Sequence, residues 1–352
     1  MKKTFLSLVS LGIGHYSVAL PQNVDWNELK ALAERQGLSA VVLDGIEKLP
    51  EQQRPPKVFL LEWIGETLQG YEYRYEQYKK AIAEMAAFYN NHGHKMMLLK
   101  GYACSLDWPK PEHRPCGDID IWLFRKQKEA DELLVKEKGI EIDSSHHHHT
   151  VFYWGDFMVE NHYDFVNVHA HRSSAEMEKV FKELGQDDSH SVEVYGEKVY
   201  LPSANLHALF LIKHMVSHFA AAEISLRQVL DWAFFVEKHT CEIDWEWLNG
   251  MIDRFHMRDF VYCINAICVE ELGFETITFG GVQFNPQLKD RILSDILCPA
   301  YTSAEPQGLI RKWAYKYRRW QGNAWKQDIC YEESRWDGFW TLLKSHIIKP
   351  KA

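Results

Sequence analysis

Hydrophobic side chains recur every three or four positions before residue 92, which is the spacing of amphipathic helices. The stretch from Val24 to Leu49 repeats this spacing on both sides of Gly37, so it predicts a helical hairpin. Residues 57 to 92 continue the pattern with a stripe of aromatic rings and predict one or two long helices. Such a stripe is typical of a packed core, and we assign it no ligand.

Between residues 93 and 201 the apolar runs become shorter, which is typical of strands. Met96 to Leu99 predict a buried strand, followed by a tight turn at Lys100-Gly101 and a short helix. Residues 126 to 138 predict an amphipathic helix that ends at Gly139. Further strands are expected at residues 117–123, 140–142, 149–153, 157–165, 192–195 and 198–200, with hairpin turns at Gly155-Asp156 and Gly196-Glu197.

Helical spacing returns after Pro202, with Ser203 as the predicted N-cap, and continues with short breaks to the end. The order of helices, a mixed block and helices again predicts an α+β fold. We expect an N-terminal helical region over residues 1–92, an α+β core over residues 93–201 and a C-terminal helical region over residues 202–352.

The composition narrows the class of protein. A chain of 352 residues that is 46% apolar can bury a substantial core. A net charge of -9 argues against a general binder of nucleic acid or anionic membranes. Seven cysteines without a C-x-x-C pair indicate buried, reduced thiols and an intracellular location.

The N-terminus resembles a signal peptide in part. Lys2-Lys3 precede an apolar run, and Ser17-Val18-Ala19 offers a cleavage site. His15 and Tyr16 interrupt this pattern, and the cysteine usage is that of a cytoplasmic protein, so we favour a first helix of the folded domain over export. No run approaches the roughly 20 apolar residues of a membrane span.

The chemistry centres on Gly117-Asp118-Ile119-Asp120. Alternation along a strand places Asp118 and Asp120 on one face, where two hard oxygen donors suit Mg²⁺. Taken alone, such a pair is equally consistent with two carboxylates that face solvent and bind no metal. Glu160 is the best third carboxylate, since its strand also carries His162 and Asp164 on the same face. His162 would orient a carboxylate or touch substrate, whereas Asp164 would lie beyond the site.

Three further features have two interpretations each. Arg114 would neutralise either phosphate or a surface acid. His214 and His218 lie one helical turn apart and would either ligate a metal or, as we favour, line substrate or the core. Arg227 and Asp231 have the same spacing and favour a buried ion pair.

Two segments remain open. The histidine run 146–149, followed by His162, His169 and His171, would either form a transition-metal site or, as we favour, face solvent or substrate beside the Mg²⁺ cleft. Residues 309–326 alternate cationic and aromatic side chains. They would either stack on nucleic-acid bases, face a membrane or, as we favour, bury their rings under extended cations.

Several motifs then occur in an order that resembles a known family. They are Leu98-Leu99-Lys100-Gly101, Arg114, Gly117-Asp118-Ile119-Asp120, Glu160 with His162, and the later helices with His214, His218, Arg227 and Asp231. The run from Leu98 to Leu123 resembles the core of the nucleotidyltransferase superfamily, the DNA polymerase β-like fold. It is most similar to a bacterial branch known as uncharacterised nucleotidyltransferases, whose core is a mixed sheet.

The resemblance implies transfer of a nucleoside monophosphate from a triphosphate, with ATP expected, to an unidentified acceptor. It implies that Asp118 and Asp120 hold both Mg²⁺ ions, with Mn²⁺ as the alternative metal. It also implies that Glu160 is a ligand of one of these ions and activates the acceptor. Lys100, Gly101, Arg114 and Gly117 would contact the nucleotide, and His162, His214, His218 and Arg227 the substrates. The superfamily has a second glycine or a serine after Gly101, whereas this chain has Tyr102. That departure leaves a nucleotide sensor without turnover as the alternative function. The cationic and aromatic residues 309–326 leave an RNA-modifying transferase as a third.

Overall fold

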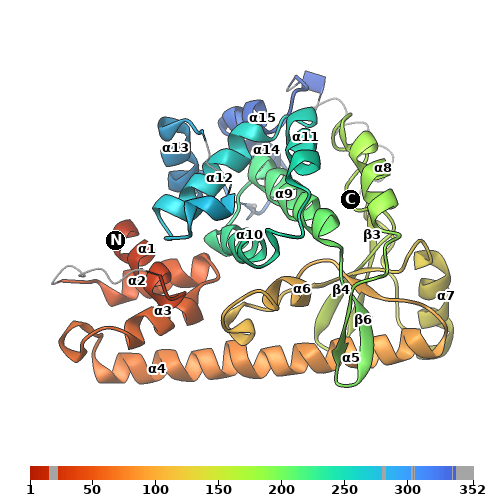
Figure 1. Cartoon of the computed structure of the whole chain (residues 1–352), viewed down its shortest axis with the longest axis horizontal. Coiled ribbons are helices and arrows are strands. Elements are labelled where there is room, and N and C mark those ends of the chain that lie inside the picture. Colours follow the sequence, from red (N-terminus) through yellow and green to blue (C-terminus); the bar gives the residue numbers. More distant parts are fainter. Residues whose placement is uncertain (16–22, 280–282, 303, 305, 335, 338–352) are drawn as a thin grey trace.

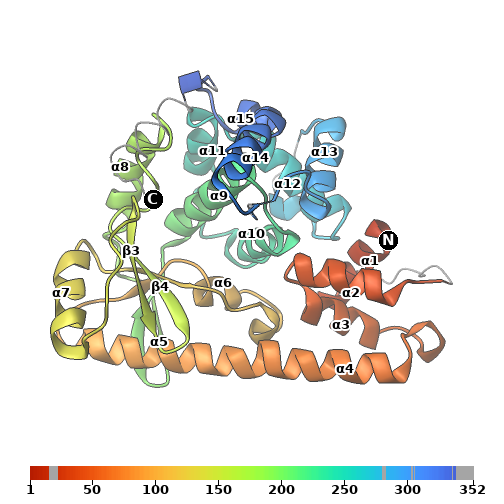
Figure 2. The same cartoon turned by 180° about the vertical axis from the view of Figure 1, so that it is seen from behind.

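The structure is a computed structural model that describes residues 1–15, 23–279, 283–302, 304, 306–334 and 336–337. One long helix runs along the whole molecule, with the N-terminal helices packed over one of its ends and the sheet over the other (Figure 1). The C-terminal helices lie across the opposite side and bridge these two parts, as the reverse view also shows (Figure 2).

The N-terminal region contains the predicted hairpin and the predicted long helix. α2 begins after Asp25, whose carboxylate accepts hydrogen bonds from the backbone N–H groups of Asn27 and Glu28. The long helix passes from α4 to α5 through a π-helical turn over Leu68–Tyr73. The bounds are α1 Lys2–Gly12, α2 Trp26–Arg35, α3 Ser39–Glu47, α4 Lys57–Thr67 and α5 Arg74–Asn91.

The first helix belongs to the folded core. Phe5, Leu8 and Val9 are completely buried in the cluster that also includes the C-terminal helices. This agrees with a helix of the folded domain over residues 2–12. The proposed cleavage site Ser17-Val18-Ala19 lies outside the described residues. Within the described chain, each helix is too short or too polar to cross a lipid bilayer.

A six-stranded mixed sheet forms the centre, in the order β3-β4-β2-β1-β6-β5. β2 runs parallel to β4, and β1 runs parallel to β6, while the other neighbours are antiparallel. Ile119 and Ile121 pack with α5 and α7 on one face of the sheet. The strands are β1 Met97–Leu98, β2 Ile119–Trp122, β3 His149–Trp154, β4 Phe157–His162, β5 Ser191–Val194 and β6 Glu197–Tyr200.

The predicted α+β class with flanking helices is confirmed, with three local corrections. Residues 140–142 form no strand, and only Asp143 bridges to Val151. The second hairpin turns at Tyr195-Gly196, one residue earlier than predicted. Helix α8 was missed, although Met177 and Phe181 mark its buried face. The helices of this block are α6 Tyr102–Ser105, α7 Gln127–Lys138 and α8 Ser174–Leu184.

The C-terminal region is helical with short breaks from Ala204 to Cys330, as predicted, and Ser203 is the N-cap of α9. The part of this prediction that falls on residues 338–352 lies outside the described residues. Its helices share a hydrophobic cluster with α1, α2 and α3, so the two ends of the chain stabilise one another. The bounds are α9 Ala204–Ala221, α10 Leu226–His239, α11 Trp245–Arg254, α12 Arg258–Glu270, α13 Pro286–Leu297, α14 Leu309–Gly322 and α15 Ala324–Cys330.

Two expectations about side chains need correction. All seven cysteines are free thiols, but Cys241 and Cys298 are exposed rather than buried. On α14 the rings of Trp313 and Tyr317 are exposed, so this helix does not bury all its aromatic side chains. Lys326 on α15 is buried and ion-paired with Asp295 at 2.5 Å, instead of extending over the rings to solvent.

Candidate active site

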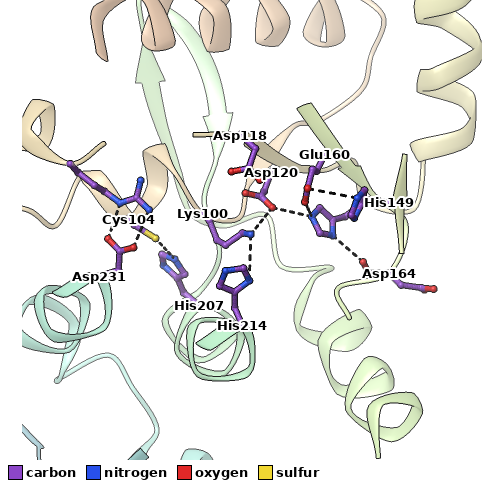
Figure 3. Close-up of polar contacts among 12 residues, drawn as sticks. Lys100, Cys104, Asp118, Asp120, His149, Glu160, Asp164, His207, His214 and Asp231 are labelled. Atoms are coloured by element: carbon purple, nitrogen blue, oxygen red, sulfur yellow. Dashed lines mark hydrogen bonds and ion pairs between the residues drawn. The ribbon is translucent and has the colours of Figure 1, made fainter. Parts of the chain in front are cut away.

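Three carboxylates meet on the face of the sheet that points away from α5. In the parallel pairing of β2 with β4, Asp120 lies directly opposite Glu160. Asp118 precedes Asp120 by two positions and therefore projects from the same face. Figure 3 shows Asp118, Asp120 and Glu160 side by side. The predicted convergence of the third carboxylate on the pair thus follows from strand register.

Lys100 and His162 bring positive charge to these acids. Lys100 Nζ lies 2.8 Å from Asp120 Oδ1, and His162 Nε2 lies 3.1 Å from the same oxygen (Figure 3). His162 Nε2 also lies 3.6 Å from Glu160 Oε2. Burial alone would raise the pKa of Asp120, but the charge of Lys100 and the contacts with His162 hold it well below its usual range.

The pKa values of the two neighbouring carboxylates, Asp118 and Glu160, shift in opposite directions. Burial raises the pKa of Asp118, and the negative charge of Asp120 adds to this effect. Burial would also raise the pKa of Glu160, but its contact with His162 lowers it. Burial alone would lower the pKa of Lys100, whereas the three carboxylates raise it, so Lys100 remains charged. The acids are thus held near one another by two cations.

The position of Lys100 depends on the glycine that follows it. Gly101 has φ +59°, and a Cβ there would lie 2.3 Å from the hydroxyl oxygen of Tyr78. That hydroxyl donates a 2.8 Å hydrogen bond to the carbonyl oxygen of Asp118. The glycine therefore lets the Lys100 turn approach the strand that carries the acids. Gly117 is exposed just before this strand and borders the same cavity.

Arg114 has a partner that neither sequence interpretation named. Its Nε and Nη2 donate hydrogen bonds of 2.7 and 3.0 Å to the two carboxylate oxygens of Asp231. Trp108 Nε1 donates to the same carboxylate at 2.9 Å. The buried ion pair predicted for Asp231 therefore involves Arg114, not Arg227. It joins the loop before β2 to helix α10 and so stabilises the fold between the core and the C-terminal helices.

Helices α9 and α10 form the opposite wall. His214 Nδ1 lies 3.5 Å from Lys100 Nζ, and its ring centre is 4.3 Å from that of His218. Burial lowers the pKa of both imidazoles, and the charge of Lys100 lowers it further. Arg227 has no hydrogen bond or ion pair among the described residues. Burial lowers its pKa, and the negative charge of Asp231 offsets part of that shift. These side chains face the acids, as expected for residues that line substrate.

One functional side chain escaped the sequence analysis. Lys213 is 4% exposed on α9 and borders the cavity. Its Nζ donates a 3.3 Å hydrogen bond to the hydroxyl of Tyr331. Burial lowers the pKa of Lys213 to about 8. Lys213 lies within an apolar helical stretch, where the sequence pattern indicates only a core position. The sequence around it therefore could not show that it borders a cavity.

Lys213 and every site residue that the sequence predicted line one cavity of about 1320 Å³ between the sheet and the C-terminal helices. Its cationic side chains outnumber its acids, although the whole chain carries a charge of -9. The cations are Arg35, Lys100, Arg114, Lys213, Arg227, Lys316 and Arg319, and the acids are Asp118, Asp120, Glu160, Glu223 and Asp231.

The acid cluster fits a divalent metal ion. Asp120, Glu160 and His162 each place one donor atom within 4.8 Å of the others. Carboxylate oxygens are the ligands that Mg²⁺ prefers. Asp164 lies beyond this group, as expected, because β4 ends at His162 and the Asp164 side chain pairs with Lys182. The site therefore brings together the acids that the sequence resemblance implied for a nucleotidyltransferase.

Comparison with known proteins identifies the family. Residues 22–273 match the family model described as "Uncharacterised nucleotidyltransferase". This match spans more than half of the chain, and the protein belongs to this uncharacterised nucleotidyltransferase family. Among solved structures, the chain is similar to an antigenic nucleotidyltransferase-like protein from Paracoccidioides brasiliensis, with 15% identity, 46% of this chain and 75% of that chain covered, and a TM-score of 0.33. No curated protein matches the chain.

Proposed function

We propose that this protein is a Mg²⁺-dependent enzyme that transfers a nucleoside monophosphate from ATP to a small molecule, a glycan intermediate or a protein. The observation that carries the proposal is the convergence of Asp118, Asp120 and Glu160 on one cavity, produced by the register of β2 against β4. The family supports the nucleotidyl-transfer reaction. The metal, the triphosphate and the acceptor are our inference from the site.

Asp118, Asp120 and Glu160 would hold the metal, with Mn²⁺ as an alternative ion. A bound Mg²⁺ would neutralise phosphate charge and lower the pKa of an attacking hydroxyl. Glu160 lies at the edge of the acid group and would accept the proton of that hydroxyl. His162 contacts both Asp120 and Glu160 and orients them.

The rest of the cavity suits an anionic substrate. Lys100 and the Gly101 turn lie next to the acids and would meet the phosphates. Arg227 and Lys213 on the helical wall have no acidic hydrogen-bond or ion-pair partner among the described residues and would bind the remaining phosphate or acceptor charge. Arg114 is paired with Asp231 through two hydrogen bonds, so we expect it to hold the helical wall in place and not to bind phosphate.

The test compares Asp118→Asn and Asp120→Asn with Asp156→Asn, which removes an exposed acid from the β3–β4 turn. We expect the two site variants to lose at least about a hundredfold in pyrophosphate release or label transfer, because metal binding supplies several kcal/mol of charge stabilisation. Asp156→Asn should retain activity. Full activity in the Asp118→Asn, Asp120→Asn double variant would exclude the proposed site.

Calorimetry with ATP separates transfer from sensing. Mg²⁺-dependent ATP binding without pyrophosphate release across many acceptors would favour a nucleotide sensor. RNA binding at low salt through the exposed Trp313 and Tyr317 on α14 would favour an RNA acceptor. Membership of the DNA polymerase β-like superfamily, a bacterial source and a cytoplasmic location remain predictions from the sequence.

A further inference from the structure

Three histidines gather beside the acid cluster. The antiparallel pairing of β3 with β4 places His149 directly opposite His162, and His148 immediately precedes β3. The ring centres of His148 and His149 lie 4.3 Å apart, and those of His148 and His162 lie 5.6 Å apart. The rings of His149 and His162 are separated by 5.3 Å. Each histidine places one nitrogen within 4.8 Å of the others.

Three nitrogens of this cluster, all on His148 and His149, lack the hydrogen-bond partners that buried polar atoms normally have. Among the described residues, His148 Nδ1 and both ring nitrogens of His149 are buried without a hydrogen bond. A buried polar atom without a hydrogen-bond partner destabilises the folded state, because it has lost its hydrogen bonds to water. A cluster that only served packing would be more stable with apolar side chains, so these nitrogens indicate a ligand that the protein chain itself does not provide.

His162 is oriented toward the same point. Its Nδ1 lies 3.1 Å from the carbonyl oxygen of Asp164 and donates a hydrogen bond to it. Its Nε2 lies 3.1 Å from Asp120 Oδ1 and 3.6 Å from Glu160 Oε2, so a bound ion would take the place of the proton that Nε2 now shares with these carboxylates. Histidines that ligate metals typically donate their second ring nitrogen to a backbone carbonyl or a carboxylate in this way. The sheet therefore both brings the three rings together and sets the orientation of one of them.

We propose that His148, His149 and His162 bind a divalent transition-metal ion of the Zn²⁺ class, next to the carboxylates assigned to Mg²⁺. Imidazole nitrogen suits such ions, whereas Mg²⁺ prefers oxygen. Glu160 borders both groups, since its Oε1 lies 3.7 Å from His149 Nε2 and its Oε2 lies 3.6 Å from His162 Nε2. It would supply the fourth ligand or link the two ions. Zn–N bonds of about 2.1 Å place the nitrogens of a tetrahedral site about 3.4 Å apart, so the three nitrogens, now within 4.8 Å of one another, would move closer when the ion binds.

The experiment is calorimetric titration of the intact, tag-free protein with Zn²⁺ alone. We expect one ion per chain, and about a hundredfold weaker binding in His149→Ala or His148→Ala. His146→Ala is the matched control within the same histidine run, and His190→Ala is a control on the surface. Both should bind Zn²⁺ like the unmodified protein, with circular dichroism confirming that every variant is folded.

Absorption of the Co²⁺-loaded protein gives a second measurement that needs no substitution. If the three histidines bind the ion as proposed, bound Co²⁺ should have a low coordination number and give intense visible absorption bands. Added Zn²⁺ should displace the Co²⁺ and abolish these bands. Absence of these bands, absence of a stoichiometric Zn²⁺ site, or equal weakening by His146→Ala would overturn the proposal and indicate an unstructured histidine run. Asp118→Asn should abolish transfer while leaving Zn²⁺ binding intact, so failure here and failure of the proposed function are distinguishable.

Discussion

The two walls of the cavity treat buried charge in opposite ways. On the sheet wall, Lys100 contacts Asp120 at 2.8 Å, and the nearby carboxylates outweigh its burial and raise its pKa. On the helical wall, Lys213 Nζ contacts the hydroxyl and the ring of Tyr331, and burial lowers the pKa of Lys213 to about 8. The sheet wall has carboxylates next to its lysine, whereas on the helical wall Lys213 and Arg227 have no acidic hydrogen-bond or ion-pair partner among the described residues, because Asp231 pairs with Arg114. This difference supports the proposal that the cavity binds a metal on the sheet side and an anion on the helical side.

Breaking the ion pair that joins the walls should have the largest effect on stability. Asp231→Ala would leave Arg114 buried without its partner and should lower the free energy of unfolding by about 3–5 kcal/mol. Asp120→Asn also removes a buried charge that contacts Lys100 and His162, but it keeps a polar side chain of the same shape and leaves Asp118 and Glu160 near Lys100, so the loss should be smaller, about 1–3 kcal/mol. Urea denaturation measures both.

Equal losses in these two variants would contradict the distinction between a structural and a functional ion pair. The double variant Arg114→Met, Asp231→Leu sharpens the test. Replacing both charges with apolar side chains should restore most of the stability lost in Asp231→Ala, since the cost of that variant comes from the unpaired guanidinium.

The next effect concerns the pH dependence of stability. Because the folded-state pKa of Lys213, about 8, lies below the unfolded value of 10.5, the unfolded chain binds this proton more tightly. The unfavourable contribution of Lys213 should therefore be largest below pH 8 and disappear as pH rises from 8 to 10.5. Lys213→Met should raise stability by up to about 3 kcal/mol at neutral pH, and this gain should shrink across that window.

Urea titrations of Lys213→Met and the unmodified protein at several pH values measure this difference. Lys179→Met, on the exposed surface of α8, is the control and should show a constant difference. A gain from Lys213→Met that does not change between pH 8 and 10.5 would show that the two lysines do not differ in the proposed way.

A smaller effect is expected when one cation of the helical wall is removed. Arg227→Gln should weaken Mg²⁺·ATP binding about tenfold, since a charged hydrogen bond to phosphate contributes about 1.5–3 kcal/mol. Calorimetry measures the dissociation constant, and Arg172→Gln is the exposed control. Unchanged binding in Arg227→Gln would place the triphosphate away from α10.

The smallest effect sharpens the argument for the Lys100 turn. Gly101 and Gly93 both have positive φ, but only Gly101 would bring a Cβ against Tyr78. Gly101→Ala should therefore cost about 1–2 kcal/mol more in unfolding free energy than Gly93→Ala. Adding Tyr78→Phe should recover part of that difference. Identical costs for the two alanine variants would show that the close approach does not matter.

The sequence predicted features whose causes are local. Period-two alternation placed Asp118 and Asp120 on one face and identified Glu160, and the 3.6-residue period located most helices. Helix α8 was not predicted, because it is short and only a few apolar residues, among them Met177 and Phe181, recur at helical spacing. The strand expected at residues 140–142 failed because apolar alternation over three residues does not establish a pairing partner.

The sequence by itself determined which face of each strand carries the acids and which turn needs glycine, because backbone geometry sets these within a few residues. Only the tertiary structure decided that Asp231 pairs with Arg114, that Lys213 is buried at the cavity, and that His148 and His149 meet His162. Those contacts depend on strand register and on how α9 and α10 pack against the sheet, and residues far apart in the chain carry no local signal of such packing.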